Sequence, residues 1–310
     1  MHPRPLHTLR RKPDAIAYRH YNGGALSPSI FMSVLRAGSH RLSLARPLIM
    51  GIVNTTPDSF SDGGRWHDAG AAIRHALQLQ DAGADILDVG GESTRPGAAM
   101  VPVDEEIRRV LPVIGALVDH GCVVSIDTRK PEVMRAALDA GAAMVNDVMA
   151  LRAPGALEAV AASEAAVCLM HMQGEPQTMQ QAPHYADVVD EVKQFLHGRV
   201  QACEAAGIAR ERLVIDPGFG FGKTLEHNLT LLKQLHRLAD LGMPVLAGLS
   251  RKSMLGTLTG RSVEAREFAG VAAHLSAVAH GAKLLRVHNV TAMRDALAIW
   301  NAVEEARDGT

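Results

Sequence analysis

The chain has 310 residues and a formal net charge of −1, and 47% of its residues are hydrophobic against 21% charged. This length exceeds the usual size of one domain but suits one complete β/α barrel, which needs about 250 residues, plus a short extension. The apolar content excludes disorder over most of the chain. The balanced charge gives no electrostatic reason to expect nucleic acid as a partner.

The three cysteines, Cys122, Cys168 and Cys203, lie far apart and show no metal-ligand spacing. Neither a disulfide framework nor a zinc site is therefore indicated, and a reducing, cytoplasmic environment is expected. The sequence contains no uncharged apolar run of about 18 residues. No apolar signal core follows the basic first residues, so we predict no membrane partner and no secretory signal.

Residues 1–44 are basic and contain a single acid, Asp14. Such a segment can be a transit peptide, but we favour a plain flexible extension or an early start codon. Polar and apolar residues alternate over 40–44, which predicts a small strand that caps the barrel floor. We therefore expect an N-terminal extension, 1–44, followed by a catalytic domain, 45–310.

From residue 45 onward, short runs rich in Val, Ile, Leu and Met alternate with amphipathic stretches of helical period. Runs this short and apolar indicate parallel strands buried on both faces, and the segments between them can hold crossover helices. Eight such units predict a (β/α)8 TIM barrel of the α/β class rather than an open doubly wound sheet. The predicted strands are 48–53, 86–89, 123–126, 144–148, 166–170, 213–215, 245–249 and 284–287.

The clearest predicted helix spans 187–206, where apolar residues from Val188 to Val200 recur at spacings of three and four on one face. Several helical stretches end in a glycine that leads into the next strand, as is typical of a C-cap: Gly83, Gly141, Gly207, Gly242 and Gly281. The other predicted helices are 69–82, 104–118, 131–140, 156–163, 226–241, 265–280 and 291–304.

Polar side chains lie near or just after the end of every predicted strand. In a β/α barrel these positions meet at the C-terminal mouth, where the active site lies. One or two of them could instead be helix N-caps or orient turns, but polar groups at all eight ends favour a binding site. They are Asn54, Glu92 to Arg95, Asp127, Asn146, Asp147, His171, Asp216, Ser250 to Lys252, Arg286 and His288.

Two carboxylates, Asp127 and Asp216, and the amide of Asn146 suit a planar heterocycle with amino and N–H donors, because an ionised carboxylate accepts two parallel hydrogen bonds. We place a cationic set opposite them, suited to phosphate or a carboxylate. That set is Arg95, Arg251, Lys252, Arg286 and His288. The predicted site therefore holds a ring at one side and an anion at the other.

Two polar, glycine-rich loops, 54–64 and 90–97, follow the first two barrel strands and are predicted to be mobile lids that exclude water. The segment 218–224 is not a Walker A motif, because Pro217 stands where its first glycine belongs. The chain also lacks a Rossmann glycine motif between strand and helix, an HExxH pair and a GxSxG elbow.

Several segments resemble, in order, the motifs of the dihydropteroate synthase family, over roughly residues 42–306. The first two, 49–64 and 88–97, are specific to the synthases, whereas the barrel and the two aspartates are shared with other pterin-binding proteins. The later segments are Ser125-Ile126-Asp127-Thr128, Asn146-Asp147-Val148, Met170-His171-Met172-Gln173-Gly174, Asp216-Pro217-Gly218-Phe219-Gly220-Phe221, Ser250-Arg251-Lys252-Ser253 and Arg286-Val287-His288.

The resemblance implies a Mg²⁺-dependent transferase of folate biosynthesis, a homodimer and sulfonamide target. Such an enzyme joins (7,8-dihydropterin-6-yl)methyl diphosphate to 4-aminobenzoate and releases pyrophosphate and 7,8-dihydropteroate. No sequence feature fixes the oligomeric state, although apolar positions such as Val271, Leu275 and Val278 suit a dimer interface as well as a barrel core.

The resemblance also implies the roles of individual residues. The pterin would be held by Asp127, Asn146, Met170, Asp216, Lys252 and Arg286. The diphosphate would be bound by Asn54, Arg286 and His288, with Asn54 also at the metal. The 4-aminobenzoate pocket and its loops would comprise Phe60, Asp62, Thr94, Arg95, Pro96, Phe221 and Ser253. The catalytic residues would be Asp127, Lys252, Arg286 and His288.

Diphosphate leaves readily once its charge is neutralised, and an electron-rich dihydropterin tolerates positive charge on its exocyclic methylene. We therefore expect an SN1-like reaction without an essential general base, in which Asp127 stabilises the cation. A methyltetrahydrofolate-dependent methyltransferase is the nearest alternative, but it has no use for a diphosphate site. A catalytically silent pterin-binding protein could have lost the loop and anion residues, which are all present here.

Overall fold

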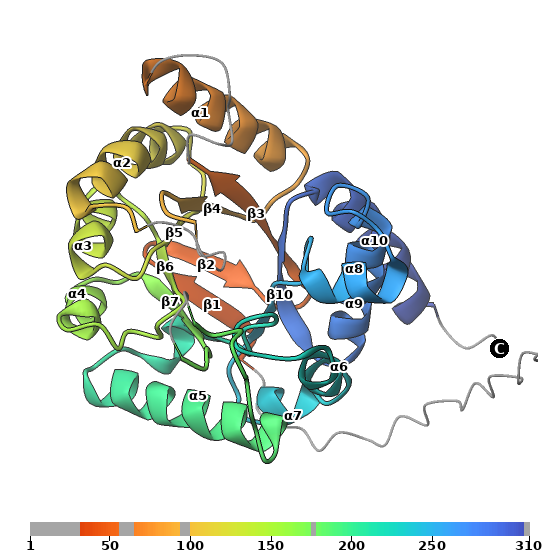
Figure 1. Ribbon diagram of the computed structural model, residues 1–310. Coiled ribbons are helices and arrows are strands. Elements are labelled where there is room, and N and C mark those ends of the chain that lie inside the picture. Colours follow the sequence, from red (N-terminus) through yellow and green to blue (C-terminus); the bar gives the residue numbers. More distant parts are fainter. Residues whose placement is uncertain (1–31, 56–64, 94–99, 175–177, 307–310) are drawn as a thin grey trace, which may run out of the picture.

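The computed structural model describes residues 32–55, 65–93, 100–174 and 178–306. Parallel strands close into a barrel in the order β10-β3-β4-β5-β6-β7-β8-β9, and helices surround it (Figure 1). This confirms the predicted (β/α)8 barrel, and every predicted strand is present with its ends shifted by at most two residues. The strands are β3 Leu48–Asn54, β4 Ile86–Gly90, β5 Val124–Asp127, β6 Met144–Asp147, β7 Ala166–Met170, β8 Leu213–Asp216, β9 Val245–Ala247 and β10 Ala282–Val287.

The helices agree with prediction except in three places. The helix α1 begins at Arg65, four residues before the predicted start. The predicted helix 226–241 is broken into α6 and α7 at Gln234, whose φ of −111° leaves the helical region although no glycine or proline marks the break. The short helix α8 was not predicted, because seven residues carry too little periodicity to detect. The helices are α1 Arg65–Asp81, α2 Val103–Asp119, α3 Pro131–Asp139, α4 Ala156–Ala161, α5 Val188–Ala205, α6 Leu225–Lys233, α7 His236–Ala239, α8 Ser253–Thr259, α9 Glu267–Ala279 and α10 Val290–Glu304.

Local signals explain where several helices begin and end. The Asp187 side chain caps α5 by accepting hydrogen bonds from the backbone N–H groups of Val189 and Asp190. The predicted C-cap glycines all have a positive φ, between 81° and 102°, which a residue with a Cβ rarely adopts. Those glycines are Gly83, Gly141, Gly207, Gly242 and Gly281.

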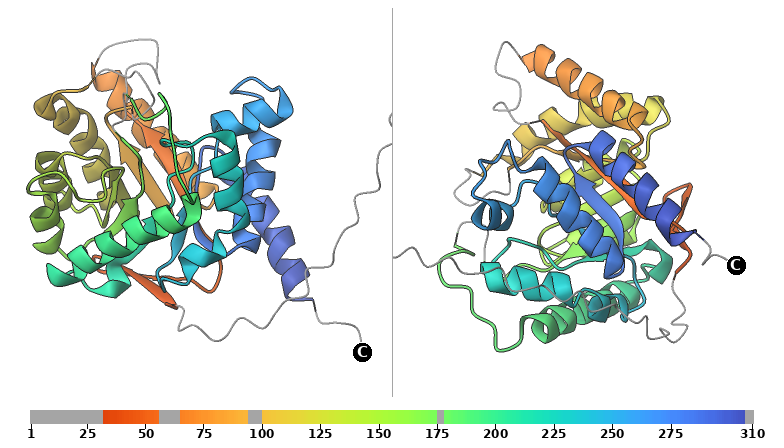
Figure 2. Two further views of the ribbon diagram at one scale, coloured as in Figure 1. Left: turned by 60° about the horizontal axis from the view of Figure 1, so that its bottom comes forward. Right: turned by 90° about the vertical axis from the view of Figure 1, so that its right-hand side faces the viewer.

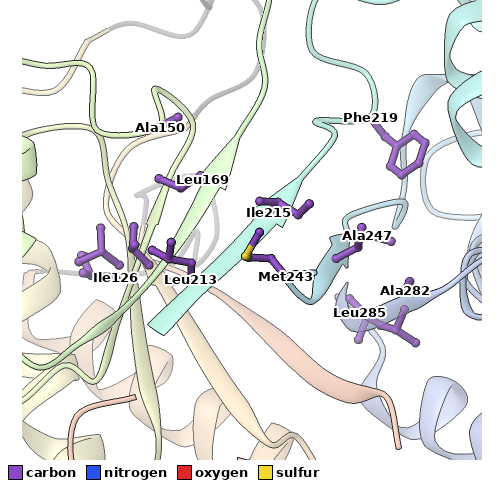
Figure 3. Packing of buried hydrophobic residues seen from close by; sticks show 14 of the residues in the cluster. Ile126, Ala150, Leu169, Leu213, Ile215, Phe219, Met243, Ala247, Ala282 and Leu285 are labelled. Carbon is purple, nitrogen blue, oxygen red and sulfur yellow. The ribbon is translucent and has the colours of Figure 1, made fainter. Parts of the chain in front are cut away.

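Side chains along each barrel strand alternate between the helix layer and the barrel interior. The outward ones, such as Ile126, Leu169 and Ile215, pack in the main hydrophobic core between strands and helices (Figure 3). The inward ones near the start of the strands form a separate apolar cluster that includes Leu48 and Met144. Further along the strands the inward positions become polar, so the barrel has an apolar lower half and a polar mouth.

The strands β1 (Val34–Ala37) and β2 (His40–Ser43) form an antiparallel hairpin. Leu35 and Ala37 are fully buried in the same cluster as the inward residues at the strand starts, so the hairpin covers the barrel floor. It crosses the centre of Figure 1 and lies at one end of the barrel in the left view of Figure 2. The small strand expected near 40–44 is therefore present, whereas β1 was not predicted. The domain boundary at residues 44 and 45 stays a proposal, and residues 1–31 lie outside the described part.

In the part of the chain that the structure describes, every helix is too short or too polar to cross a membrane.

Candidate active site

Arg286, on β10, connects two carboxylates inside the barrel mouth. Its Nε donates a hydrogen bond to Oδ2 of Asp88 at 2.6 Å, and its Nη2 donates to Oδ2 of Asp127 at 2.6 Å. The amide of Asn146 donates to the same oxygen of Asp88 at 3.0 Å. Four strands thus contribute to one hydrogen-bonded cluster of a cation, two carboxylates and an amide.

This arrangement differs from the predicted separation of carboxylates and cations. The guanidinium of Arg286 lies between Asp88 and Asp127 rather than opposite them. The reason is electrostatic: Asp88 is fully buried, and a buried carboxylate is destabilising unless a positive charge is within reach. A long arginine side chain can bridge both groups across the narrow barrel with its rigid fork of donors.

Burial shifts the pKa values of the charged groups in the barrel mouth. Burial raises the pKa of Asp127 to about 7, although the charge of Arg286 opposes the shift, and Asp88 adds to it. Burial would lower the pKa of Arg286, but the charges of Asp88 and Asp127 outweigh it and the net shift is upward. Burial also raises the pKa of Asp216 to about 6, opposed by the hydrogen bond from the Gly218 N–H. The mouth therefore contains carboxyl groups that titrate near neutral pH.

Asp88 is a site residue that sequence reasoning missed. It belongs to a segment that resembles a family motif, but it lies two residues before the end of β4, so a search for polar residues at strand ends does not find it. The sequence does contain an indication of its role. Asp88 alternates with Ile86 and Gly90 along β4, so its side chain points into the barrel, and a charged residue on that face of a buried strand needs a partner of opposite charge. Its second oxygen, Oδ1, is buried and has no hydrogen-bond partner among the residues that the structure describes.

A second group of predicted residues meets at the ends of β7 and β8. Met170 and Asp216 are register partners, and both are almost fully buried. Phe221 packs against a methionine cluster that includes Met170, and the ammonium of Lys252 lies 4.1 Å from the centre of the Phe221 ring. Burial lowers the pKa of Lys252 to about 8, while the charge of Asp216 opposes the shift. The structure thus brings these four predicted residues together.

The predicted anion-binding residues lie at the ends of β3 and β10. His288 is half-buried, and its Nδ1 lies 2.9 Å from the hydroxyl of Ser250. Asn54 is half-buried at the last position of β3, opposite Gly90 of β4. Ser253, which is predicted to belong to the 4-aminobenzoate pocket, is exposed at the first position of α8.

Other predicted residues are not placed in the site. Asp147 points away from the mouth and accepts hydrogen bonds from the N–H groups of Met149 and Leu151. His171 is buried beside Lys223. Arg251 is exposed, with a φ of +58°. Five predicted residues lie outside the described residues, together with most of the two predicted lid loops: Phe60, Asp62, Thr94, Arg95 and Pro96.

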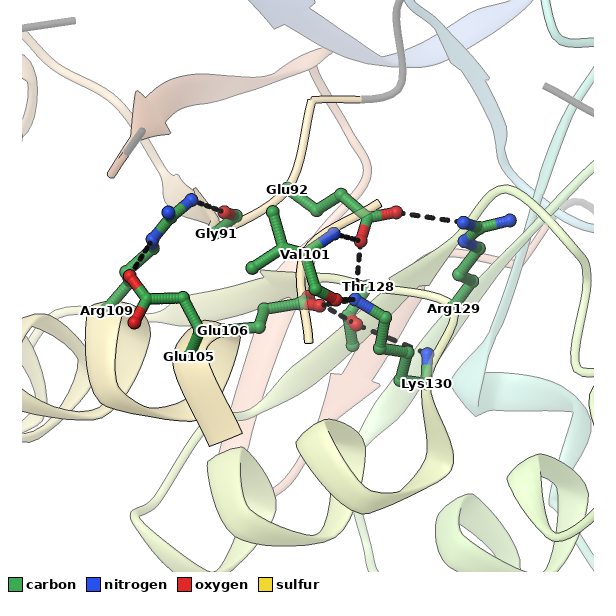
Figure 4. A network of polar contacts seen from close by, with 9 residues as sticks. All are labelled: Gly91, Glu92, Val101, Glu105, Glu106, Arg109, Thr128, Arg129 and Lys130. Carbon is green, nitrogen blue, oxygen red and sulfur yellow. Dashed lines mark hydrogen bonds and ion pairs between the residues drawn. The ribbon is translucent and has the colours of Figure 1, made fainter. Parts of the chain in front are cut away.

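A compact ion-pair network lies where the second loop leaves and rejoins the barrel (Figure 4). Lys130 donates to carboxylate oxygens of Glu92 and Glu106 and to the carbonyl oxygen of Val101. The N–H of Val101 in turn donates to Glu92 at 2.9 Å, and Thr128 donates to Glu106 at 2.7 Å. The network therefore joins Glu92 and Val101, on either side of the segment 94–99, to the end of β5.

We expect the change Lys130→Met to lower the free energy of unfolding by about 3 kcal/mol, because it leaves Glu106, which is fully buried, without its charge partner. Urea unfolding followed by circular dichroism measures this loss. The matched control is Lys193→Met, because Lys193 forms only a looser pair with the exposed Asp240, at 3.6 Å. Equal effects of the two changes would contradict the assignment of Lys130 as the centre of a buried network.

The described residues suit Mg²⁺ only together with a substrate. They contain no group of three or more His, Cys, Asp or Glu side chains arranged to hold a metal ion. Asn54 offers a hard amide oxygen at the mouth. Mg²⁺ commonly binds through one or two protein oxygens, with substrate phosphates and water completing its octahedron, so the donor set fits a metal that arrives with a diphosphate.

Comparison with known proteins shows the family of this chain. Residues 50–288 match the model of the family described as pterin binding enzyme. The dihydropteroate synthase of Neisseria meningitidis serogroup C is 52% identical over 275 residues, which cover 87% of this chain and 97% of that protein.

Two solved structures of Xanthomonas albilineans dihydropteroate synthase are also similar. The complex with 4-aminobenzoic acid has a TM-score of 0.84 and 57% identity, and the match covers 89% of this chain and 99% of that one. The complex with 7,8-dihydropteroate has a TM-score of 0.81 and 55% identity, and covers 88% and 100%. This chain therefore belongs to the pterin binding enzyme family, among its dihydropteroate synthases.

Proposed function

We propose that the protein condenses (7,8-dihydropterin-6-yl)methyl diphosphate with 4-aminobenzoate to give 7,8-dihydropteroate and pyrophosphate. The observation that carries this proposal is the cluster of Asp88, Asp127, Asn146 and Arg286 in the mouth of a barrel whose relatives are dihydropteroate synthases. It combines acceptors for a donor-rich ring with a cation for a departing anion.

The pterin ring would lie between the ends of β5, β6 and β8. Asp127 and Asp216 would accept hydrogen bonds from its amino and N–H groups. The amide of Asn146 would form a hydrogen bond with another polar edge of the same ring. Met170 and the guanidinium of Arg286 would contact the ring faces, since planar cations stack well on aromatic systems. Lys252, held over Phe221, would face the polar edge from the opposite side.

The diphosphate would lie toward the ends of β3 and β10. Arg286 and His288 would donate hydrogen bonds to its oxygens, and Asn54 would help to hold Mg²⁺, which when bound neutralises charge on the leaving group. Arg286 is already oriented by Asp88, so its guanidinium need not reorganise as the C–O bond breaks. The pyrophosphate can then leave before the amine arrives.

Departure of pyrophosphate leaves positive charge on the methylene of the pterin, and the negative charges of Asp127 and Asp88 would stabilise it. 4-Aminobenzoate would enter beside Phe221 and Ser253 and the loops that carry Phe60, Asp62, Thr94, Arg95 and Pro96. Its amine is mostly neutral at pH 7 and attacks the methylene carbon directly, losing its proton to solvent. No side chain is needed as an essential base.

Incubation of the purified protein with both substrates and Mg²⁺, followed by mass spectrometry, tests the activity. The expected result is 7,8-dihydropteroate, formed only when both substrates are present. A methylated product from a methyltetrahydrofolate donor, without any dihydropteroate, would instead assign the barrel to methyl transfer.

Pterin binding should depend on pH. Binding needs Asp127 and Asp216 ionised, and their pKa values of about 7 and about 6 mean that both gain protons as the pH falls. Each unit of pH below a pKa costs about tenfold in ionised fraction, so affinity for 6-hydroxymethylpterin should fall about 10³-fold from pH 8 to pH 5, about 10²-fold from Asp127 and about tenfold from Asp216. Calorimetric titration across that range measures it, and equal affinity at both ends would rule out ionised carboxylates as the acceptors.

A homodimer is part of the proposal. Large apolar side chains are exposed on the neighbouring helices α8, α9 and α10, among them Leu258 (54% exposed), Phe268 (86%) and Ile299 (69%). Large apolar side chains exposed on neighbouring helices are typical of an interface, and cyclic dimers are the commonest assembly. We also propose a cytoplasmic location, with which three free, buried cysteines are compatible, and competitive inhibition by sulfonamides as analogues of 4-aminobenzoate.

A further inference from the structure

Lys223 is a buried cation that has no part in the proposed chemistry. It follows β8 in the segment 217–224, and only 3% of its surface is exposed. Lysine is rarely buried this deeply unless its ammonium group is fully hydrogen-bonded. The hydrogen-bond partners of the Lys223 ammonium group therefore have to account for its burial.

Three acceptors lie at equal distance from the ammonium of Lys223, and the carbonyl oxygen of His171 lies farther away, at 3.4 Å. Its Nζ lies 3.0 Å from the carbonyl oxygen of Gly218, 3.0 Å from that of Phe221 and 3.0 Å from Nδ1 of His171. Burial lowers the pKa of Lys223 to about 7, while the charge of Asp216 opposes the shift. In its protonated form lysine has three N–H donors and no acceptor, so these contacts can use all of its donors. Burial and the charge of Lys223 lower the pKa of His171 to about 2, which keeps its ring neutral and able to accept.

The segment closes tightly around this group. Gly218 has a φ of +67°, and a Cβ there would lie 2.0 Å from the carbonyl oxygen of His171, so the backbone passes directly against the end of β7. The carbonyl of Gly218 also accepts from the N–H of Phe221 at 3.1 Å, and Asp216 accepts from the N–H of Gly218 at 2.7 Å. The backbone from Asp216 to Phe221 is thus folded around one ammonium group.

Residues at both ends of this backbone are in the proposed site. Asp216 is an acceptor for the pterin, and Phe221 lies in the pocket for 4-aminobenzoate with Lys252 over its ring. We propose that Lys223 is a positioning residue for the reaction: its ammonium group holds the segment 217–224 in the conformation that places the Phe221 ring. The inference rests on the proposed function of Phe221 and deepens it.

The first test is Lys223→Met, which keeps the length of the side chain and removes its donors. Hydrogen–deuterium exchange of the segment 217–224 in the free protein should become at least about tenfold faster, because its carbonyls lose their common donor. The KM for 4-aminobenzoate should rise about tenfold, since a small misplacement in an active site has effects of this size. The affinity for 6-hydroxymethylpterin should change less, because Asp127 and Asn146 are untouched. The exposed Lys233, on α6, supplies the matched control Lys233→Met, which should change none of these values.

A second pair of variants keeps the proposal testable should Lys223→Met fail to fold. The change His171→Leu removes the imidazole Nδ1 that accepts from Lys223. The change His171→Asn introduces an amide oxygen that can accept in place of Nδ1. We expect a raised KM for 4-aminobenzoate in the leucine variant and a value near that of the wild type in the asparagine variant. An unchanged exchange rate and KM in folded Lys223→Met, or equal effects of the two His171 variants, would overturn the proposal. If the unaltered protein forms no dihydropteroate but exchange still quickens in Lys223→Met, the proposed function fails while the fold of the segment stands.

Discussion

Replacing Arg286 with methionine is expected to lower kcat/KM for the dihydropterin diphosphate by about 10³-fold, the size of effect seen when a preorganised donor to a developing charge is removed. In the free protein the guanidinium is already held by Asp88 and Asp127, at 2.6 Å from each. It is therefore in place before the leaving group departs. Steady-state kinetics with a pyrophosphate-coupled assay measures the loss.

The same change should lower the free energy of unfolding. Asp88 is fully buried, and removing one partner of a buried ion pair costs about 3–5 kcal/mol because the remaining charge is left without compensation. Arg286→Lys is the informative intermediate: it restores a positive charge but not the two donors needed to reach both carboxylates. We expect it to recover much of the stability and little of the activity.

Arg135→Met is the matched control, because Arg135 is exposed and, among the described residues, donates only to the carbonyl of Gly155. It should leave activity and stability close to those of the wild type. Retention of more than a tenth of the wild-type kcat/KM by a folded Arg286→Met protein would remove Arg286 from the anion site.

The second large effect is expected for Asp127→Asn. The substitution keeps the shape of the side chain but removes the negative charge that faces the developing cation, so kcat should fall about 10²-fold. Arg286 keeps its contact with Asp88, which limits the structural change. If kcat stayed at the wild-type value while 6-hydroxymethylpterin still bound, Asp127 would have no part in stabilising the cation.

The dependence of the rate of Asp127→Asn on pH shows whether the charge of Asp127, rather than the shape of its side chain, matters for the reaction. The pKa of Asp127 is raised to about 7, so the wild-type rate should fall as the pH drops through 7 and the carboxylate is protonated. Asparagine cannot titrate, and that limb of the profile should be missing in Asp127→Asn. Asp216→Asn serves as the comparison, since the limb near pH 7 should persist there.

The barrel itself was predictable because its strands are buried on both faces and therefore appear as short, continuous apolar runs. The polar residues at the strand ends were predictable for the same reason, since they interrupt those runs. Asp216 and Asn146 were found this way. The break at Gln234 could not be predicted, because no glycine or proline lies there. The helix α8 could not be predicted, because it is too short to show a helical period.

The pairing of charges could not be predicted from the sequence. Arg286 and Asp88 are 198 residues apart, and their contact depends on the closure of the barrel between β10 and β3. Lys130 and Lys223 look like ordinary surface lysines in the sequence, but the fold brings carboxylates or carbonyls around each of them. Only the three-dimensional arrangement distinguishes a buried lysine from a solvated one.

The most direct test of the proposed function measures pyrophosphate release from the dihydropterin diphosphate and Mg²⁺, with and without 4-aminobenzoate. We expect release at a high steady rate with 4-aminobenzoate, matched mole for mole by 7,8-dihydropteroate. Without the amine, radiolabelled pyrophosphate should exchange into the substrate, because departure precedes attack. Bound pterin with neither release nor exchange would contradict the assignment and indicate a protein that binds pterins without transferring them.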